Sequence, residues 1–280
     1  MSGSGPTEDR VDTIEAGGHR IAYARKGDGP PIVLLHGYVG DRRTWRRQID
    51  DLSDEFTVVA WDAPGYGASS DPPEGFRLAD VADCLAAFID ALDLGRPHVV
   101  GLSFGGGLAL ELYHRHSELP LTLVLAGAYA GWAGSLPAEV VEERLQQALR
   151  LADLPPDRLV DELLPTLFTD SAGAELVEEL AASMREFHPA GLRANARAFA
   201  EADLRDVLPQ IAVPTLLLYG DKDVRASLDV ARGLHAGIPG SRLVILEGVG
   251  HVSNVEAPER FNAELRAFLR APAADPAEGR

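Results

Sequence analysis

Short runs of apolar residues alternate with helical patterns over most of the chain. Seven runs have the length of strands and are mostly continuous in apolar residues: HRIAYAR, PIVLLH, FTVVAWD, HVVGLS, LTLVLAG, TLLLYG and SRLVILEG. Continuous apolar runs are typical of strands buried on both faces of a parallel sheet. Helical stretches lie between them, at 80–94, 104–116, 227–236 and 258–269. The alternation predicts an α/β fold with right-handed βαβ units and a mostly parallel, doubly wound sheet of about eight strands.

One long segment, 129–206, interrupts this alternation because it carries helix signals and no strand pattern. Serines and prolines that open helices recur in it, and leucines fall at helical spacing. A helical insert between parallel strands would cover their carboxyl ends, where ligands bind in such sheets. We therefore expect a core domain made of 1–128 and 207–280, with an all-helical cap, 129–206, inserted after the sixth strand.

The composition narrows the classes of partner. The 280 residues carry a formal net charge of −17, which argues against nucleic acid and anionic membranes as partners. The longest apolar stretch, LTLVLAGAYAGWAG, is broken by glycine and too short to span a membrane. The single cysteine, Cys84, has no internal partner for a disulfide, and the first residues lack the apolar core of a secretory signal. We expect a soluble cytoplasmic protein with a small-molecule substrate; the sequence predicts no oligomeric state.

Four glycines surround one serine in VVGLSFGGGLAL, where a predicted strand passes into a predicted helix. Glycine costs backbone entropy inside regular structure, so the cluster needs a reason. A nucleophilic serine on a sharp strand-to-helix turn has a strained backbone, which is tolerable only when its neighbours lack side chains. Gly101 and Gly105, two residues on either side of Ser103, remove the Cβ atoms that would collide across that turn. Ser103 is therefore the candidate nucleophile. The stretch fits neither a phosphate-binding loop nor a dinucleotide fingerprint.

A serine alone is a poor nucleophile, so a base and an orienting acid must accompany it. On this type of turn the chain order is serine, carboxylate, histidine. The run PTLLLYGDKD is a strand that ends with two candidate acids, Asp221 and Asp223. After the next strand, LVILEGVGHVSN presents His251 in a glycine-flanked loop. The order is satisfied with His251 as the base and either aspartate as the acid.

An oxyanion hole requires two backbone N–H groups near the nucleophile. The N–H of Phe104, directly after Ser103, is one candidate. The second is the N–H of Tyr38, just after the His-Gly pair in IVLLHGYVG. The chain has no H-E-x-x-H motif and no Cys/His cluster, so a zinc mechanism is unsupported and the predicted chemistry needs no cofactor.

The expected cap supplies candidates for a substrate pocket. Its apolar residues are too many for a solvated appendage, so some should face the serine. The aromatic and apolar candidates are Trp132, Leu136, Phe168 and Phe187, for each of which packing within the cap is an equal alternative. Arg193 and Arg197, one helical turn apart, are candidates to hold a substrate carboxylate, although a solvent-exposed helix face explains the same spacing.

From about Ile21 to Leu269 the chain resembles the α/β-hydrolase superfamily. The matching motifs are HGYVG, VVAWDAPGYGASS, GLSFGG, PTLLLYGDKD and GVGHVSNVEAPERF. In that family the acid lies three residues after the strand-end glycine, which implies Asp223, with Asp221 as the alternative. The segment HPAGLRANARAFAEADLRDVLPQIAVPTLLLYGDKD is similar to β-ketoadipate enol-lactone hydrolases and to carboxylesterases. Haloalkane dehalogenases and epoxide hydrolases have an aspartate where Ser103 stands, so both are disfavoured.

The leading hypothesis from the sequence is a serine hydrolase that cleaves small carboxylic esters or lactones through an acyl-enzyme intermediate. Two alternatives stay open. One is a lyase or C–C bond hydrolase that uses the same triad. The other is a non-catalytic ligand receptor built on a hydrolase scaffold, against which an intact triad argues.

Overall fold

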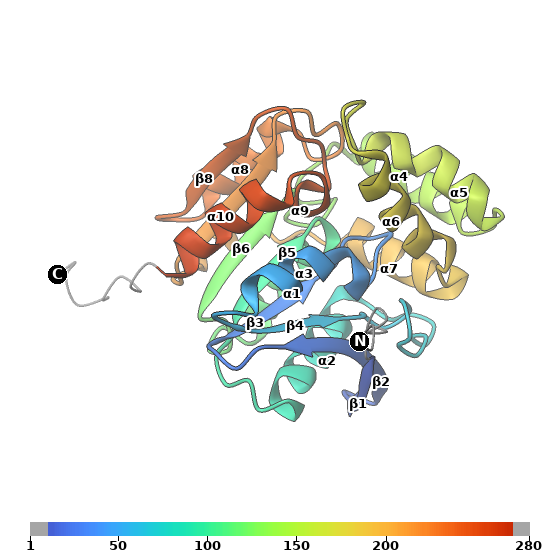
Figure 1. The fold of residues 1–280 in the computed structure, drawn as a ribbon. Helices are drawn as coiled ribbons and strands as arrows, with labels where there is room; N and C mark the ends of the chain where they lie inside the picture. The colour runs from blue at the N-terminus through green and yellow to red at the C-terminus, as the bar shows by residue number, and fades with distance from the viewer. Residues whose placement is uncertain (1–10, 271–280) are drawn as a thin grey trace, which may run out of the picture.

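A single mixed sheet organises the protein. The structure is a computed structural model that describes residues 11–270 (Figure 1). Its eight strands lie in the order β1-β2-β4-β3-β5-β6-β7-β8. Their bounds are β1 (Asp12–Ala16), β2 (His19–Lys26), β3 (Pro31–Leu35), β4 (Thr57–Trp61), β5 (His98–Leu102), β6 (Thr122–Ala126), β7 (Thr215–Gly220) and β8 (Arg242–Leu246). Strand β2 pairs antiparallel with β1 and β4, and the remaining pairs are parallel. The predicted α/β fold with a mostly parallel sheet of about eight strands is confirmed.

The central strands explain why the pattern could be read from the sequence. Every residue of β4, β5 and β6 is buried, as continuous apolar runs require. Strand β1 was not among the predicted runs. It lies at the edge of the sheet, and its sequence DTIEA alternates between exposed and partly buried positions over its first four residues. Such a strand has no continuous apolar run for the sequence to show.

Helices cover both faces of the sheet. Helix α1 (Arg46–Leu52), which follows the short 3-10 helix η1 (Arg42–Trp45), packs beside α10 (Pro258–Leu269). Helix α2 (Leu78–Ala91) packs beside α3 (Phe104–Arg115) on the opposite face (Figure 1). Helices α8 (Leu228–Gly237) and α9 (Ser253–Glu256) flank the last strands. This arrangement brings the loops that follow β3, β5, β7 and β8 to one end of the sheet.

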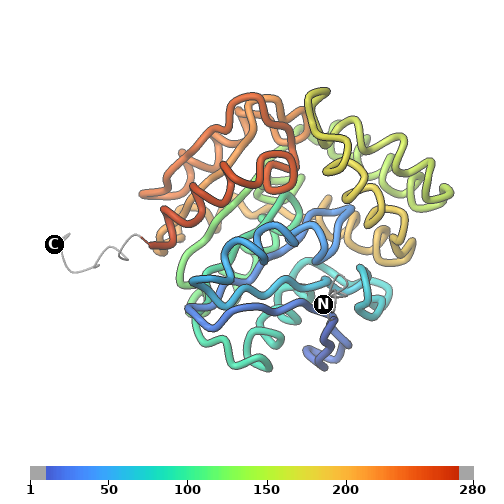
Figure 2. The backbone as a smooth tube through the Cα atoms, in the orientation of Figure 1, coloured from blue at the N-terminus to red at the C-terminus, as the bar shows by residue number. Residues whose placement is uncertain are grey.

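Between β6 and β7 the described chain is helical and contains no strand. The helices are α4 (Ala138–Leu151), α5 (Pro156–Leu163), α6 (Ala174–Arg185) and α7 (Pro189–Glu201), with 3-10 turns η2 (Leu164–Thr166) and η3 (Leu208–Gln210). Helix α4 packs on α7, and α5 packs on α6. Helices α4–α7 gather beyond one end of the sheet, at the upper right of Figures 1 and 2. They fall within the predicted cap, 129–206, whose boundaries and standing as a separate domain remain predictions. The outer ends of the predicted core, 1–10 and 271–280, lie outside the described residues.

None of the helices within residues 11–270 has the length and apolar character needed to cross a membrane.

Candidate active site

Ser103 occupies a strained turn between β5 and α3. Its backbone has φ 53° and ψ −110°, and a positive φ is uncommon for any residue other than glycine. The Ser103 N–H donates to the carbonyl of Ala126 at 2.7 Å, and its carbonyl accepts the N–H groups of Gly106 and Gly107. These backbone bonds to β6 and α3 fix the strained residue. We call this turn, residues 101–105, the elbow.

The elbow depends on two close backbone approaches. A Cβ atom on Gly101 would lie 2.2 Å from the carbonyl oxygen of Gly105. A Cβ atom on Gly105 would lie 2.3 Å from the carbonyl oxygen of Leu35, the last residue of β3. Neither contact can be relieved by moving a flexible side chain, because both partners are backbone atoms. The expectation that these glycines remove colliding Cβ atoms is therefore confirmed.

The loop after β7 places Asp223 against His251. The Nδ1 atom of His251 lies 2.8 Å from Oδ2 of Asp223, and both side chains are almost fully buried. The other carboxylate oxygen, Oδ1, accepts the N–H groups of Arg225 and Ala226, each at 2.8 Å. Both carboxylate oxygens are thus used within the loop and by the histidine. An imidazole whose Nδ1 is held in this way presents Nε2 to a neighbouring nucleophile.

The alternative acid, Asp221, points to different partners. Its Oδ1 atom accepts the N–H of Gly248 at 2.6 Å, and its Oδ2 atom lies 3.3 Å from the ammonium of Lys222. These contacts connect the loop after β7 to the loop after β8. No contact with His251 occurs for Asp221 among the described residues.

Two backbone N–H groups near Ser103 lack an acceptor. Phe104 is the first residue of α3, and the first N–H groups of a helix have no acceptor within the helix. The N–H of Tyr38 belongs to the turn after β3. Neither makes a hydrogen bond with any part of the chain that the structure describes. Free N–H groups beside a strained serine are the arrangement that an oxyanion hole requires.

The side chain of Tyr38 holds the turn that carries it against helix α7. The Tyr38 hydroxyl donates to the carbonyl of Leu192, in α7, at 2.8 Å. Burial raises the pKa of Tyr38, so the hydroxyl keeps its proton and stays a donor. The first turn of helix α7 is thereby fixed to the loop after β3.

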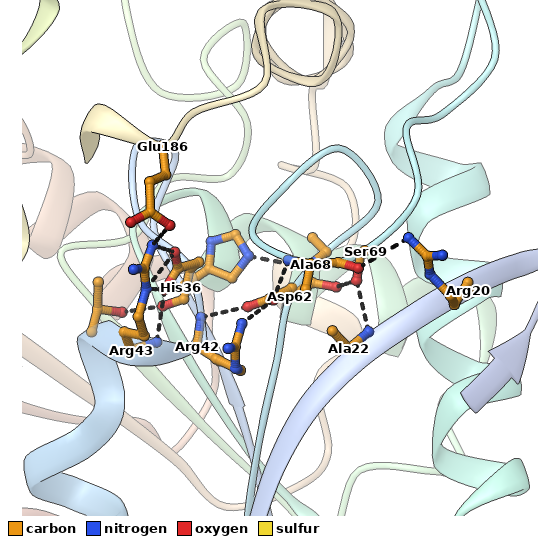
Figure 3. A network of polar contacts seen from close by, with 12 residues as sticks. Arg20, Ala22, His36, Arg42, Arg43, Asp62, Ala68, Ser69 and Glu186 are labelled. Carbon is orange, nitrogen blue, oxygen red and sulfur yellow. Dashed lines mark hydrogen bonds and ion pairs between the residues drawn. The ribbon is translucent and has the colours of Figure 1, made fainter. Parts of the chain in front are cut away.

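His36 braces the same turn from the core side (Figure 3). Its Nε2 atom accepts the N–H of Ala63 at 3.0 Å, so the ring proton must lie on Nδ1, which is 2.8 Å from the carbonyl oxygen of Gly37. Burial lowers the pKa of His36, which favours this neutral form. His36 is therefore a structural link between the loops after β3 and β4.

A buried carboxylate extends that bracing (Figure 3). Asp62 accepts the backbone N–H of Arg42 at 2.8 Å, the Arg42 guanidinium, and the N–H of Ala68 at 2.9 Å. The carbonyl of Asp62 accepts the Ser69 hydroxyl at 2.7 Å, and that hydroxyl accepts the N–H of Ala22 at 2.9 Å. The network ties the segment after β3 to the middle of β2 and to the end of β4.

A pocket lies between the elbow and the helices that follow β6. Its empty volume is about 780 Å³, open solvent at the mouth included. Ser103, His251 and Tyr38 line it together. Apolar and aromatic side chains form most of the remaining wall, among them Tyr129, Trp132, Leu151, Leu163, Leu167, Leu180 and Phe199. The candidate nucleophile Ser103, the candidate base His251 and the loop of Tyr38 therefore face one mostly apolar chamber.

The profile of a protein family described as "alpha/beta hydrolase fold" matches residues 30–258. The chain belongs to the α/β-hydrolase family. This α/β hydrolase is 28% identical over 265 residues to 3-oxoadipate enol-lactonase 2 of Acinetobacter baylyi, covering 92% of this chain and 96% of the relative. A thermophilic esterase from Thermogutta terrifontis has a similar structure, with a TM-score of 0.86 and 29% identity over 93% of this chain and 98% of the esterase. The enol-lactonase from Burkholderia xenovorans gives a TM-score of 0.83 and 27% identity over 92% of this chain and 99% of the other.

The predicted pocket residues of this α/β hydrolase divide into two groups. Trp132 lines the pocket and packs edge to face with Phe199 at 5.7 Å between ring centroids. Five other candidates are not among the described residues that form its wall: Leu136, Phe168, Phe187, Arg193 and Arg197. The first three are partly buried and pack against the main apolar core. Arg193 forms an ion pair with Asp153, and Arg197 is exposed.

Sequence reasoning missed several lining residues that the helices contribute. Leu163, Leu167 and Leu180 lie at helical spacing, which indicated a buried face but not what that face contacts. Arg144 of α4 and Arg225, two residues after Asp223, also line the pocket of this α/β hydrolase. Neither had a distinguishing signal, since the chain is rich in arginine.

No group of three or more His, Cys, Asp or Glu side chains within residues 11–270 is placed to hold a metal ion.

Proposed function

We propose that this α/β hydrolase is a serine hydrolase that cleaves small carboxylic esters or lactones. One observation carries the proposal. Ser103, on a turn with φ 53°, shares a pocket with His251, whose Nδ1 lies 2.8 Å from the buried carboxylate of Asp223. A strained serine, an oriented imidazole and an apolar chamber together supply the parts of nucleophilic acyl transfer.

In the proposed reaction His251 removes the proton of Ser103 as the hydroxyl oxygen attacks the acyl carbon. The N–H groups of Tyr38 and Phe104 stabilise the oxyanion, and Asp223 holds the imidazole in the tautomer that leaves Nε2 free to accept. His251 then gives its proton to the departing alkoxide. A water molecule, deprotonated by the same imidazole, releases the acid and restores Ser103.

The relatives support the choice of an ester or a lactone as substrate. An esterase and two enol-lactonases are among the proteins that this chain resembles over more than nine-tenths of its length. We infer the cytoplasm as the place of action, because the single cysteine suits a reducing compartment.

The test combines a covalent probe with a substrate. A fluorophosphonate probe should add once to the protein, on Ser103, as intact mass and peptide mapping would show. The protein should also hydrolyse 4-nitrophenyl acetate, and Ser103→Ala should lose both properties while keeping its circular dichroism spectrum. Labelling at another residue, or turnover in Ser103→Ala, would refute the assignment. A folded protein that neither reacts with the probe nor turns over the ester would favour the receptor alternative.

A further inference from the structure

The charged side chains that line the pocket are positive, whereas the protein as a whole is strongly negative. The chain has a formal net charge of −17. Yet the described residues that form the pocket wall include two arginines, Arg144 and Arg225, and no aspartate, glutamate or lysine. Two guanidinium groups beside an apolar chamber create a locally positive site, because low-dielectric walls focus the field of a charge.

The contacts of these two arginines are neutral. Arg144 donates from Nη1 to the Tyr129 hydroxyl at 3.0 Å and from Nη2 to the Arg225 carbonyl at 2.9 Å, with its Cζ atom 5.6 Å from the Tyr129 ring centroid. Arg225 donates from Nη1 to the Thr166 hydroxyl at 3.1 Å. A guanidinium has five N–H donors. Most of those on Arg144 and Arg225 have no acceptor among the described residues.

Three other arginines on the helices after β6 are compensated by carboxylates, and Arg158 and Arg197, which form no ion pair with any described residue, are exposed to solvent. Arg150 pairs with Glu162, Arg185 with Glu178 and Asp157, and Arg193 with Asp153. Arg144 and Arg225 form no such pair with any described residue. The carboxylate nearest to Arg225 along the chain is that of Asp223, which attracts the guanidinium. Both oxygens of Asp223 are already occupied by His251 and by backbone N–H groups. An arginine placed in a pocket without a carboxylate has a positive charge that an incoming anion can neutralise.

Burial also destabilises the charged form of the Arg225 guanidinium. It lowers the pKa of Arg225, and the neighbouring Arg144 charge lowers it further. Arginine nevertheless stays protonated in proteins. A bound anion would offset the cost of keeping both charges in the pocket.

We infer that Arg144 and Arg225 bind a carboxylate of the substrate, which is therefore an ester or lactone that carries a second, anionic group. The planar guanidinium fork matches the two oxygens of a carboxylate. Arg225 also connects this subsite to the candidate triad, since its backbone N–H donates to Asp223 at 2.8 Å. The inference rests on the proposed function, because it assigns the substrate class of the same pocket.

The test uses matched pairs of esters in which one member carries a carboxylate and the other is neutral. For the acyl side, mono-4-nitrophenyl adipate is compared with 4-nitrophenyl hexanoate, which has the same chain length. For the alcohol side, 4-acetoxybenzoate is compared with 4-acetoxybenzamide. In at least one pair the wild-type kcat/KM should favour the carboxylate. The preference should fall about tenfold to a hundredfold in the Arg144→Met, Arg225→Met double variant, as expected for charge-assisted hydrogen bonds.

The control is Arg150→Met, which removes an exposed, paired arginine from the same helix α4 and should leave the preference unchanged. Arg225→Lys keeps a positive charge and should retain part of it. A role confined to holding the helices in place predicts equal losses for both members of each pair, and that result would overturn the inference. So would a wild-type protein without any preference for the carboxylates. If the neutral esters are hydrolysed and Ser103 is labelled, such a failure leaves the proposed function intact. Absence of both labelling and turnover would instead refute the proposed function.

Discussion

The Oδ2 atom of Asp223 lies 2.8 Å from Nδ1 of His251, and less than a twentieth of either side chain is exposed. The contact joins the loop after β7 to the loop after β8, which are 28 residues apart in the chain. Its depth matters because a buried carboxylate with fixed partners cannot turn away from the imidazole. The tautomer of His251 is therefore set by Asp223 before any substrate binds.

Replacing Asp223 should slow ester hydrolysis far more than replacing its neighbour Asp221. Asp223→Asn would put an amide in place of the carboxylate and favour the wrong tautomer of His251, lowering ester kcat by up to about 10⁴-fold. Asp221→Asn should lower it less than about threefold, since Asp221 contacts Gly248 and Lys222 instead. Steady-state kinetics with 4-nitrophenyl acetate measure both. The reverse order of effects would give the acid role to Asp221.

Two glycine-to-alanine substitutions within helices should change the free energy of unfolding in opposite directions. In Gly105→Ala the new methyl group would lie 2.3 Å from the Leu35 carbonyl oxygen, so α3 must move from the sheet, at a cost of about 3 kcal/mol or more. In Gly233→Ala, on the exposed side of α8, nothing lies within 4 Å of the new atom. Alanine's helix propensity should then stabilise the protein by about 0.5–1 kcal/mol. Urea unfolding curves measure both, and equal effects would contradict the packing argument at the elbow.

The sequence predicted most clearly those strands whose residues are all buried. Strands β4, β5 and β6 are buried at every residue, so their apolar runs are continuous and their type is unambiguous. Strand β1 was missed because its exposed face carries the polar residues Thr13 and Glu15, which interrupt any apolar run. The other edge strand, β8, is also only partly buried but was predicted, because its sequence RLVIL keeps a continuous apolar run.

The candidate site divides in the same way. Ser103, its glycines and the order of acid and base are local features of loops that directly follow strands, so the motifs identify them. The pocket wall depends on how separate helices pack. Helical spacing showed that Arg193 and Arg197 share a face, but not that Asp153 lies beside Arg193. Only the packing of α4 against the rest of the structure places Arg144 next to Tyr129 and the loop of Arg225.

Cys84 should be inert in the folded protein. The residue is 2% exposed, and burial raises the pKa of its thiol to about 12. Only the thiolate reacts with iodoacetamide, and a rise of this size reduces the thiolate fraction at pH 8 about a thousandfold. We expect no alkylation over hours in the native state and complete alkylation in urea, followed by mass spectrometry. Rapid alkylation of the folded protein would show that α2 opens locally.

The buried carboxylate of Asp62 (Figure 3) should stabilise the fold far more than an exposed carboxylate does. Asp62 is fully buried and paired with Arg42, whose side chain is 12% exposed, whereas Asp50 and Lys26 form an ion pair with both side chains more than half exposed. Asp62→Ala leaves the Arg42 guanidinium and two backbone N–H groups without their acceptor, so the free energy of unfolding should fall by about 3–5 kcal/mol. Asp50→Ala should cost less than about 1 kcal/mol, because solvent screens an exposed pair.

Urea titrations of the two aspartate variants, at low and at high salt, measure the difference. High salt should remove the small effect of Asp50→Ala and leave that of Asp62→Ala nearly unchanged, since buried pairs are screened much less. Because the Asp62 network also braces the turn that carries Tyr38, the folded fraction of Asp62→Ala should hydrolyse 4-nitrophenyl acetate more slowly than wild type. Equal stability losses in the two variants would mean that the Asp62 network does not hold this end of the sheet together.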